Sequence, residues 1–248
     1  MAIANSSWKF FTPCDLKDYT VIVPSVAVGN VAQLTCDLLI SSLKMTKIAS
    51  IYTAAVIPMI GYDPYAINSK SLSTSCELYA CSTRKVAVIQ FRAPLVCKYA
   101  RDFLSYIVHH LEDNNVKELI ILTSSFAHER KHVMTSSFRY LVNELYGSKD
   151  KFNELKWVEH EKTEQGLMIY GGGFASLLFD ISKEKMPCLI LYKYCSEGDN
   201  VPDAYDMIQQ LSVVAPMLFK DKNLTAHLVQ PVSWKLLFGA DLQTELAL

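Results

Sequence analysis

The sequence predicts an α/β fold with a largely parallel central sheet. Short apolar runs bounded by Gly or Pro recur along the chain, as is typical of fully buried strands. Stretches with apolar residues three and four positions apart follow several of these runs and indicate amphipathic helices. Because strands alternate with helices in this way, a largely parallel sheet is favoured over an antiparallel one.

Length and composition indicate one globular domain. The chain has 248 residues, of which 50% are hydrophobic and 20% charged, so it contains enough apolar material for a sizeable core. Domains usually hold about 100–200 residues. We therefore expect a single α/β domain over residues 1–239 and a C-terminal tail over residues 240–248.

Charge and hydropathy argue against nucleic acid and membranes as partners, and cysteine usage indicates the compartment. A net charge of −1 without a stripe of Lys and Arg argues against binding to nucleic acid. No uninterrupted apolar stretch approaches about 18 residues, so no membrane association is expected. The seven cysteines are scattered and form no CxxC pair, and the N-terminus has no signal-like segment. Both features indicate an intracellular protein with reduced thiols.

The first expected strand spans residues 19–23 and ends at Pro24. A helix follows from Gly29 and Asn30, because apolar residues at helical spacing share one face there. These residues are Val31, Leu34, Leu38 and Leu43. Strand and helix together make the first unit of the alternating pattern.

A second strand is expected at residues 48–52, before a long segment without regular pattern that extends to about Ser75. Residues that break regular structure interrupt this segment at Pro58, Gly61 and Pro64. Long loops of this kind often carry interaction surfaces. Two further strands, at 76–79 and 85–91, are predicted around a turn at 82–84.

The middle of the chain contains a helix followed by a strand at 118–122. The apolar face of the helix consists of Tyr99, Phe103, Ile107 and Leu111. The pattern weakens between residues 126 and 156, where the polar run 147–151 is expected to form a surface loop. Residues 157–160 are expected to form an edge strand.

The clearest strand, loop and helix unit lies near the C-terminal end. A buried strand is predicted at 188–192, and the loop 196–204 supplies a Gly for an unusual backbone angle, an Asn cap and a first-turn Pro. The apolar stripe of the next helix consists of Ala204, Met207, Ile208, Leu211, Ala215 and Leu218. Another helix is expected at 174–181 after the triple glycine at 171–173, and a short one at 234–238.

Residues 128–132, His-Glu-Arg-Lys-His, form an HExxH sequence. Two imidazoles four positions apart on a helix bind zinc in metalloproteases, and the glutamate activates a water. That helix must pack beneath a cleft, where Arg130 and Lys131 would place two charges. A third ligand is not evident, although Glu154 and His160 are the nearest later candidates. An exposed, charged helix turn explains the motif better, and a zinc-dependent hydrolase stays as the alternative function.

Two further motifs invite a ligand and have simpler explanations. The triple glycine at 171–173 has neither the GxxxxGK[ST] nor the GxGxxG pattern, so close packing at a helix entry is favoured over a phosphate cradle. Four carboxylates that are candidates for a divalent metal follow the strand at 188–192: Glu197, Asp199, Asp203 and Asp206. The dipole of the following helix already explains the last two of them.

No catalytic constellation is predicted. The GxSxG pattern is absent, and Cys36 lies on an apolar helix where a packed thiol is expected. His109 and His110 lie on the helix that contains Leu111, one facing the sheet edge and the other water. We therefore expect no catalytic residue, no metal ligand and no cofactor.

Several blocks of the sequence resemble the proteasome assembly chaperone 2 family. In chain order they are residues 23–34, residues 52–58 with Asn68, residues 136–141, the triple glycine at 171–173, the SEGDNxPDA stretch at 196–204 and residues 233–239. The SEGDNxPDA stretch is the most specific of them. Because the blocks follow the order of the family over nearly the whole chain, the resemblance covers the predicted domain.

The resemblance implies a three-layer α/β/α sandwich, similar to nucleoside phosphorylases, in a chaperone that is not an enzyme. Members of this family pair with proteasome assembly chaperone 1. The heterodimer binds the ring of α-subunits during assembly of the 20S proteasome, stabilises it and prevents aberrant ring dimerisation. A cytoplasmic and nuclear location is implied as well, and the family needs no zinc motif at 128–132.

The resemblance also implies a role in partner binding for Leu246, Ala247 and Leu248. Proteasome α-rings have pockets between neighbouring subunits, and chaperones of this kind insert C-terminal residues there, ideally a hydrophobic residue, a tyrosine and any residue. Here Leu246 supplies the hydrophobic residue and Ala247 replaces the tyrosine. The terminal carboxylate of Leu248 still suits a pocket lysine. We therefore expect the tail to be an auxiliary anchor.

Overall fold

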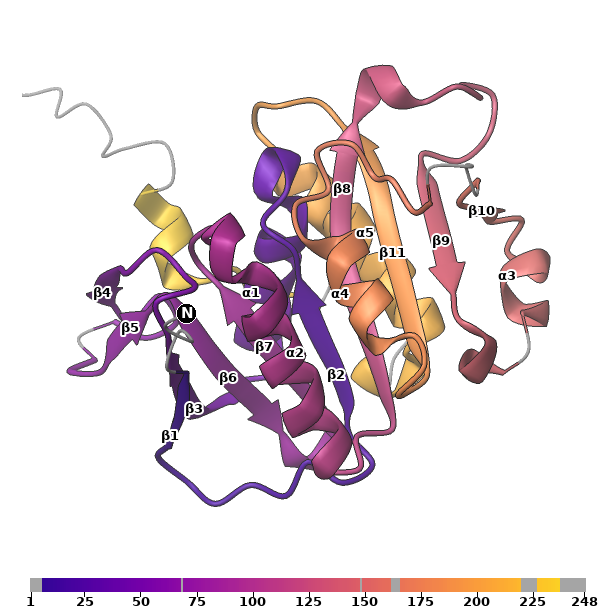
Figure 1. Cartoon of the computed structure of the whole chain (residues 1–248). Coiled ribbons are helices and arrows are strands. Elements are labelled where there is room, and N and C mark those ends of the chain that lie inside the picture. The colour runs from indigo at the N-terminus through magenta and orange to yellow at the C-terminus, as the bar shows by residue number, and fades with distance from the viewer. Residues whose placement is uncertain (1–5, 68, 148, 162–165, 220–226, 237–248) are drawn as a thin grey trace, which may run out of the picture.

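A mixed sheet of nine strands runs through the described residues, which are 6–67, 69–147, 149–161, 166–219 and 227–236 of the computed structural model (Figure 1). The strands of this sheet are β1 (Ser7–Phe10), β2 (Thr20–Pro24), β3 (Thr46–Tyr52), β6 (Cys76–Cys81), β7 (Val86–Phe91), β8 (Glu118–Phe126), β9 (Phe138–Val142), β10 (Val158–Glu159) and β11 (Cys188–Cys195). Their spatial order is β1-β3-β6-β7-β2-β8-β11-β9-β10. A separate hairpin is formed by β4 (Ile60–Tyr62) and β5 (Leu72–Thr74).

The centre of the large sheet is parallel, as the sequence predicts. Strands β7, β2, β8 and β11 run in the same direction. On one side, β6, β3 and β1 continue the sheet in antiparallel pairs. On the other side β9 is antiparallel to β11, and β10 is parallel to β9 at the edge. The predicted edge strand at 157–160 is thus confirmed.

Helices cover both faces of the sheet and complete the predicted three-layer sandwich (Figure 1). One face is covered by α1 (Val31–Ser42) and α5 (Val201–Val214), the other by α2 (Cys97–Asp113) and α4 (Ala175–Ser182). A single turn, α3 (Asp150–Glu154), lies beside β9 and β10. Strand side chains alternate between the layers, since Val21 and Val23 pack with α2 and α4 whereas Ile22 packs with α1 and α5.

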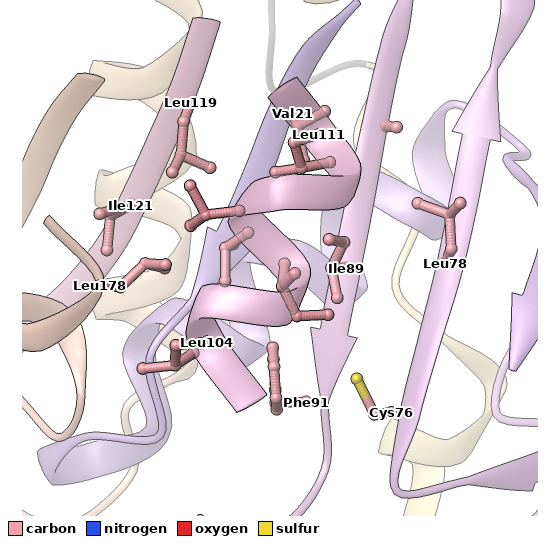
Figure 2. Packing of buried hydrophobic residues seen from close by; sticks show 14 of the residues in the cluster. Val21, Cys76, Leu78, Ile89, Phe91, Leu104, Leu111, Leu119, Ile121 and Leu178 are labelled. Atoms are coloured by element: carbon pink, nitrogen blue, oxygen red, sulfur yellow. The ribbon is translucent and has the colours of Figure 1, made fainter. Parts of the chain in front are cut away.

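Buried apolar side chains hold α2 against the sheet. Figure 2 shows Leu104 and Leu111 of α2 close to Ile89 and Phe91 of β7, and all four belong to one buried cluster. These side chains are fully buried. Burial of each side chain stabilises the fold by about 1.5–3 kcal/mol relative to an exposed position.

Across the described part of the chain, no helix combines the length and apolar character that a bilayer crossing requires.

Some elements differ from the prediction. The predicted helix over 204–218 ends at Val214, because Pro216 cannot donate the backbone hydrogen bond that would continue it. Residues 216–218 form a 3-10 turn instead. The short C-terminal helix is a 3-10 turn at 232–236, and the predicted boundary at residue 239 lies outside the described residues.

Candidate partner-binding surface

The carboxyl ends of β2 and β8 mark the place where an enzyme of this architecture would hold a ligand. The chain itself fills that place with the segment that leads into α4. The hydroxyls of Thr123 and Ser25 both donate to the carbonyl oxygen of Gly172, over 2.9 and 2.8 Å. The N–H of Phe174 donates to the Ser25 hydroxyl over 2.8 Å. These bonds join the two strand ends to the glycine segment.

The triple glycine allows this close approach. Gly173 has φ +60°, and a Cβ atom there would lie 2.1 Å from the carbonyl oxygen of Val26. A Cβ atom on Gly171 would lie 2.8 Å from the ring of Phe126. The predicted close packing is therefore confirmed, and these glycines hold the chain against strand ends rather than around a phosphate.

The HExxH residues lie on an exposed turn beyond the end of β8 (Figure 1). Residues 127–129 form a 3-10 turn, and residues 130–136 contain no helix, so the predicted helix turn is wrong. His128 stacks on the ring of Phe126, with a centroid distance of 5.1 Å. His132 places Nε2 3.1 Å from a carboxylate oxygen of Glu161. The two imidazoles therefore do not share the helix face that an HExxH zinc site needs.

A polar cavity lies near the carboxyl end of β11, beside the HExxH turn. It has a volume of about 110 Å³, and its lining includes Arg139, His160, Tyr192 and Tyr194. His160 shares a 2.8 Å hydrogen bond with the Tyr192 hydroxyl through Nδ1. Small-molecule sites usually measure about 300–1,000 Å³. The cavity is thus small for a substrate site.

Two of the four carboxylates that follow β11, Asp203 and Asp206, have a structural partner. Lys193 is buried, and its Nζ lies 2.6 Å from both Asp203 and Asp206. Burial opposes the charge of this ammonium, but its hydrogen bonds to the two carboxylates outweigh burial and raise the pKa of Lys193. Asp203 also lies in the first turn of α5, where the predicted interaction with the helix dipole applies, so the ion pair adds a second reason for this carboxylate.

The SEGDNxPDA loop packs on the entry to α1. A Cβ atom on Gly29, where φ is +65°, would lie 2.6 Å from Oδ1 of Asn200. Asn200 also donates to the carbonyl oxygen of Ser196 and to Asp203, each over 2.8 Å. The loop thus joins the beginnings of α1 and α5, which gives this stretch a structural role.

The thiol and imidazoles singled out in the sequence also have structural surroundings. Cys36 is fully buried on α1, and burial raises the pKa of its thiol well above its ordinary value. His110 stacks on Trp8 of the edge strand β1 at 4.3 Å, and burial lowers the pKa of its imidazole. The neighbouring His109 ring is exposed and contacts the carbonyl oxygen of Ser105. The predicted packed thiol and the division between sheet edge and water are confirmed.

Exposed apolar side chains gather at the margin of the sheet that carries β1. More than half of the large exposed apolar side chains among the described residues belong to this margin or to the adjoining segment. They are Phe10, Phe11, Tyr52, Ile57, Met59, Ile60, Tyr62, Ile67 and Leu72. Exposed apolar groups that gather in this way mark sites of protein interaction.

Part of this margin forms a groove of about 600 Å³ between β3 and the β4–β5 hairpin, which we call the edge groove. Its large apolar lining residues are Phe11, Tyr52, Ile60 and Leu72. The other lining residues are Lys47, Lys70, Thr46, Ser50, Ser71 and Thr74. No carboxylate lines the groove within the described residues, so its charged lining is entirely basic.

A buried carboxylate fixes β5 against the sheet. Glu77 of β6 is only 1% exposed. Its oxygens accept hydrogen bonds from the Ser73 hydroxyl over 2.9 Å and from the N–H of Thr74 over 3.0 Å. The Tyr79 hydroxyl donates to it over 2.7 Å, and Lys47 Nζ lies 3.2 Å away. The hairpin therefore has a fixed position on the sheet.

A second buried carboxylate fixes the middle of the segment that carries the hairpin. Asp37 of α1 accepts hydrogen bonds from the Tyr65 hydroxyl over 2.6 Å and from Gln90 over 2.7 Å. Arg92 lies 3.0 Å from the same carboxylate and donates to the Tyr65 oxygen over 2.8 Å. Burial, then the charge of Asp37, raises the pKa of Tyr65 well above its ordinary value. The tyrosine is therefore a neutral donor.

The interaction surface expected in the segment after residue 52 stays a prediction. The segment after residue 52 carries exposed apolar groups, as expected of a long loop, but it forms a hairpin and is tied to α1 and β6. The contribution of Phe11 was missed. The predicted binding residues Leu246, Ala247 and Leu248 lie outside the described residues.

Comparison with other sequences reveals clear relatives. A sequence profile of the PAC2 family matches residues 21–221. Proteasome assembly chaperone 2 of Xenopus tropicalis is 35% identical over 243 residues, which cover 91% of this chain and 93% of that protein. Proteasome assembly chaperone 2 of Homo sapiens is 34% identical over 259 residues, covering 94% of this chain and 98% of that protein.

The fold is similar to that of Pyrococcus furiosus PbaA, an archaeal homolog of proteasome-assembly chaperone. The TM-score is 0.60 at 14% identity, and the match covers 86% of this chain and 90% of that chain. At this identity the likeness shows the arrangement of sheet and helices alone.

Proposed function

The chain belongs to the PAC2 family, and we propose that it is a chaperone for assembly of the 20S proteasome. In this proposal it pairs with proteasome assembly chaperone 1, in the cytoplasm and nucleus. The heterodimer binds the ring of α-subunits, stabilises the ring and prevents aberrant ring dimerisation. The observation that carries the proposal is 35% identity to a proteasome assembly chaperone 2 over 91% of this chain.

The structure supports action through surfaces rather than through a pocket. The chain's own glycine segment fills the place at the ends of β2 and β8 where a ligand would bind. Exposed apolar side chains gather instead at the margin of the sheet that carries β1. Both features suit a protein that binds other proteins without catalysing a reaction.

The alternative function is a zinc-dependent hydrolase that uses the HExxH at residues 128–132. A double variant, His128→Ala/His132→Ala, separates the two functions. We expect it to bind proteasome assembly chaperone 1 as tightly as the wild type, because both imidazoles lie on an exposed turn. We also expect elemental analysis of the wild type to find no stoichiometric zinc.

Binding can be measured by titrating purified proteasome assembly chaperone 1 into each variant in a calorimeter. A second double variant, Lys183→Ala/Lys185→Ala, serves as a control for loss of exposed charged groups elsewhere. One zinc ion per chain, together with hydrolytic activity that the His variant loses, would support the hydrolase and contradict the chaperone.

We further propose that Leu246 inserts into a pocket of the α-ring and that the Leu248 carboxylate meets a lysine there. Removal of residues 246–248 is expected to weaken binding to the α-ring by about 1–3 kcal/mol, for one buried leucine side chain and one screened ion pair. The heterodimer is expected to stay intact. Surface plasmon resonance against immobilised α-rings measures the first effect, and size-exclusion chromatography the second. Unchanged ring affinity would remove the tail from the proposal.

A further inference from the structure

We propose that the edge groove is the docking site of the partner chaperone and that it receives an apolar side chain flanked by carboxylates. This inference rests on the proposed function, because it names the surface through which the heterodimer forms. Three properties of the groove support it: its rigidity, its charge and the exposure of its apolar groups.

The groove is held open before any partner arrives. Glu77 fixes Ser73 and Thr74 of β5, while Lys47 donates to the carbonyl oxygen of Leu72 over 2.6 Å. Tyr65, in the connection between β4 and β5, is fixed by its hydrogen bond to Asp37. A surface whose geometry is already fixed loses little conformational entropy when it binds. An apolar groove with such supports is therefore suited to a specific partner.

The charge of the groove selects an acidic partner segment. Lys47 is paired with Glu77, but Lys70 forms no ion pair with a described residue. Lys9 projects from β1 near Phe11, with Nζ 6.0 Å from the ring centroid, and likewise has no ion pair with a described residue. A second copy of this chain would bring the same lysines against them. A segment with carboxylates beside its apolar side chain instead complements both lysines.

The apolar character of the groove favours a permanent partner over a transient one. Ile60 is 69% exposed and Leu72 is 51% exposed in the isolated chain. Interfaces between permanent partners are larger and more hydrophobic than those between transient partners. The α-ring is bound only during assembly in the proposed function, whereas the partner chaperone would cover the groove throughout.

The experiment titrates purified proteasome assembly chaperone 1 into the full chain and two groove variants. The variant Ile60→Glu/Leu72→Glu is expected to lower affinity at least about 100-fold, because it places carboxylates where apolar and acidic groups of the partner must fit. Lys70→Glu is expected to lower affinity about 10-fold, with a weaker dependence on salt. Since all three side chains are on the surface, the variants are expected to fold, which circular dichroism checks.

Matched controls place the same new charge elsewhere. Met134→Glu alters a side chain that is 96% exposed beyond β8, and Val213→Glu alters the exposed side of α5. Both are expected to bind like the wild type. Equal losses in the controls and the groove variants would overturn the inference, as would unchanged binding by the groove variants.

Two further outcomes also overturn it. Groove variants that keep the partner chaperone but lose α-subunits would assign the groove to the ring. A wild-type homodimer in sedimentation that the groove variants abolish would assign it to a second copy. A wild-type chain that does not bind the partner chaperone at all would instead contradict the proposed function, so the two failures are distinguishable.

Discussion

Replacement of Asp37 by alanine is expected to destabilise the fold by about 3–5 kcal/mol, because it leaves the largely buried Arg92 guanidinium without its carboxylate. Burial alone would lower the pKa of Arg92, but the charge of Asp37, its hydrogen bond and the neighbouring Tyr65 together outweigh burial and raise it. The substitution also removes the acceptor of Tyr65 and Gln90. The expected loss therefore exceeds that of a surface ion pair, which is about 0–1 kcal/mol.

Urea unfolding of three variants tests this expectation. Asp180→Ala removes an exposed carboxylate that pairs with Lys183 and is the matched control, with an expected change below about 1 kcal/mol. Asp37→Leu/Arg92→Met removes both buried charges and is expected to recover much of the lost stability. A loss below about 1 kcal/mol in Asp37→Ala would show that the network does not hold the segment in place.

Truncation of Phe91 to alanine is expected to destabilise the fold by about 3–5 kcal/mol, because it opens a cavity in the core that its neighbours cannot fill. Phe91 is fully buried at the end of β7, beneath α2 (Figure 2). Its ring packs edge-on against Phe103 of α2 at 6.2 Å and lies 5.0 Å from Phe174 at the entry to α4. One side chain thus joins the sheet to two helices.

The matched control for this variant is Tyr62→Ala, which truncates an aromatic side chain that is 87% exposed. Its free energy of unfolding is expected to change by no more than about 0.5 kcal/mol, as is usual for surface substitutions. Its unfolding midpoint is therefore expected to stay close to that of the wild type. Thermal unfolding followed by circular dichroism compares the two. Similar midpoints for both variants would show that Phe91 is not central to the packing of α2 and α4.

The sequence predicted the parallel centre of the sheet because each of those strands carries its own local signal. Strand β11 and helix α5 show a buried run followed by a regular apolar stripe, and both exist, although β11 continues to Cys195 and α5 spans Val201–Val214. Strands β1, β4 and β5 were missed, since they are only three or four residues long and largely exposed. Whether such short strands form depends on pairing with distant parts of the chain and not on the local sequence pattern.

The edge groove could not be predicted because residues far apart in the chain form it. Phe11, Tyr52 and Leu72 meet only after β1 pairs with β3 and Glu77 fixes the hairpin. One signal was available, namely a carboxylate at position 77 inside an otherwise apolar predicted strand. A charge in that position requires several donors nearby, and the donors come from the hairpin.

The helix turn expected at the HExxH sequence does not form because of the way the chain leaves β8. The apolar strand at 118–122 was predicted to end in Thr123, Ser124 and Ser125; these three residues are buried, and β8 continues to Phe126. Their hydroxyls donate to the carbonyls of Gly172, Val28 and Tyr170. The chain then leaves the sheet at Ala127, which places the histidines on the exposed turn and not on a helix.

Copurification is the measurement that tests the proposed chaperone function most directly. The full chain, tagged at its N-terminus to keep the C-terminal tail free, is expressed in its native cells and isolated under native conditions. We expect mass spectrometry to find proteasome assembly chaperone 1 in equal amount, together with proteasome α-subunits. Recovery of the chain without these α-subunits and without a stoichiometric partner chaperone would contradict the account.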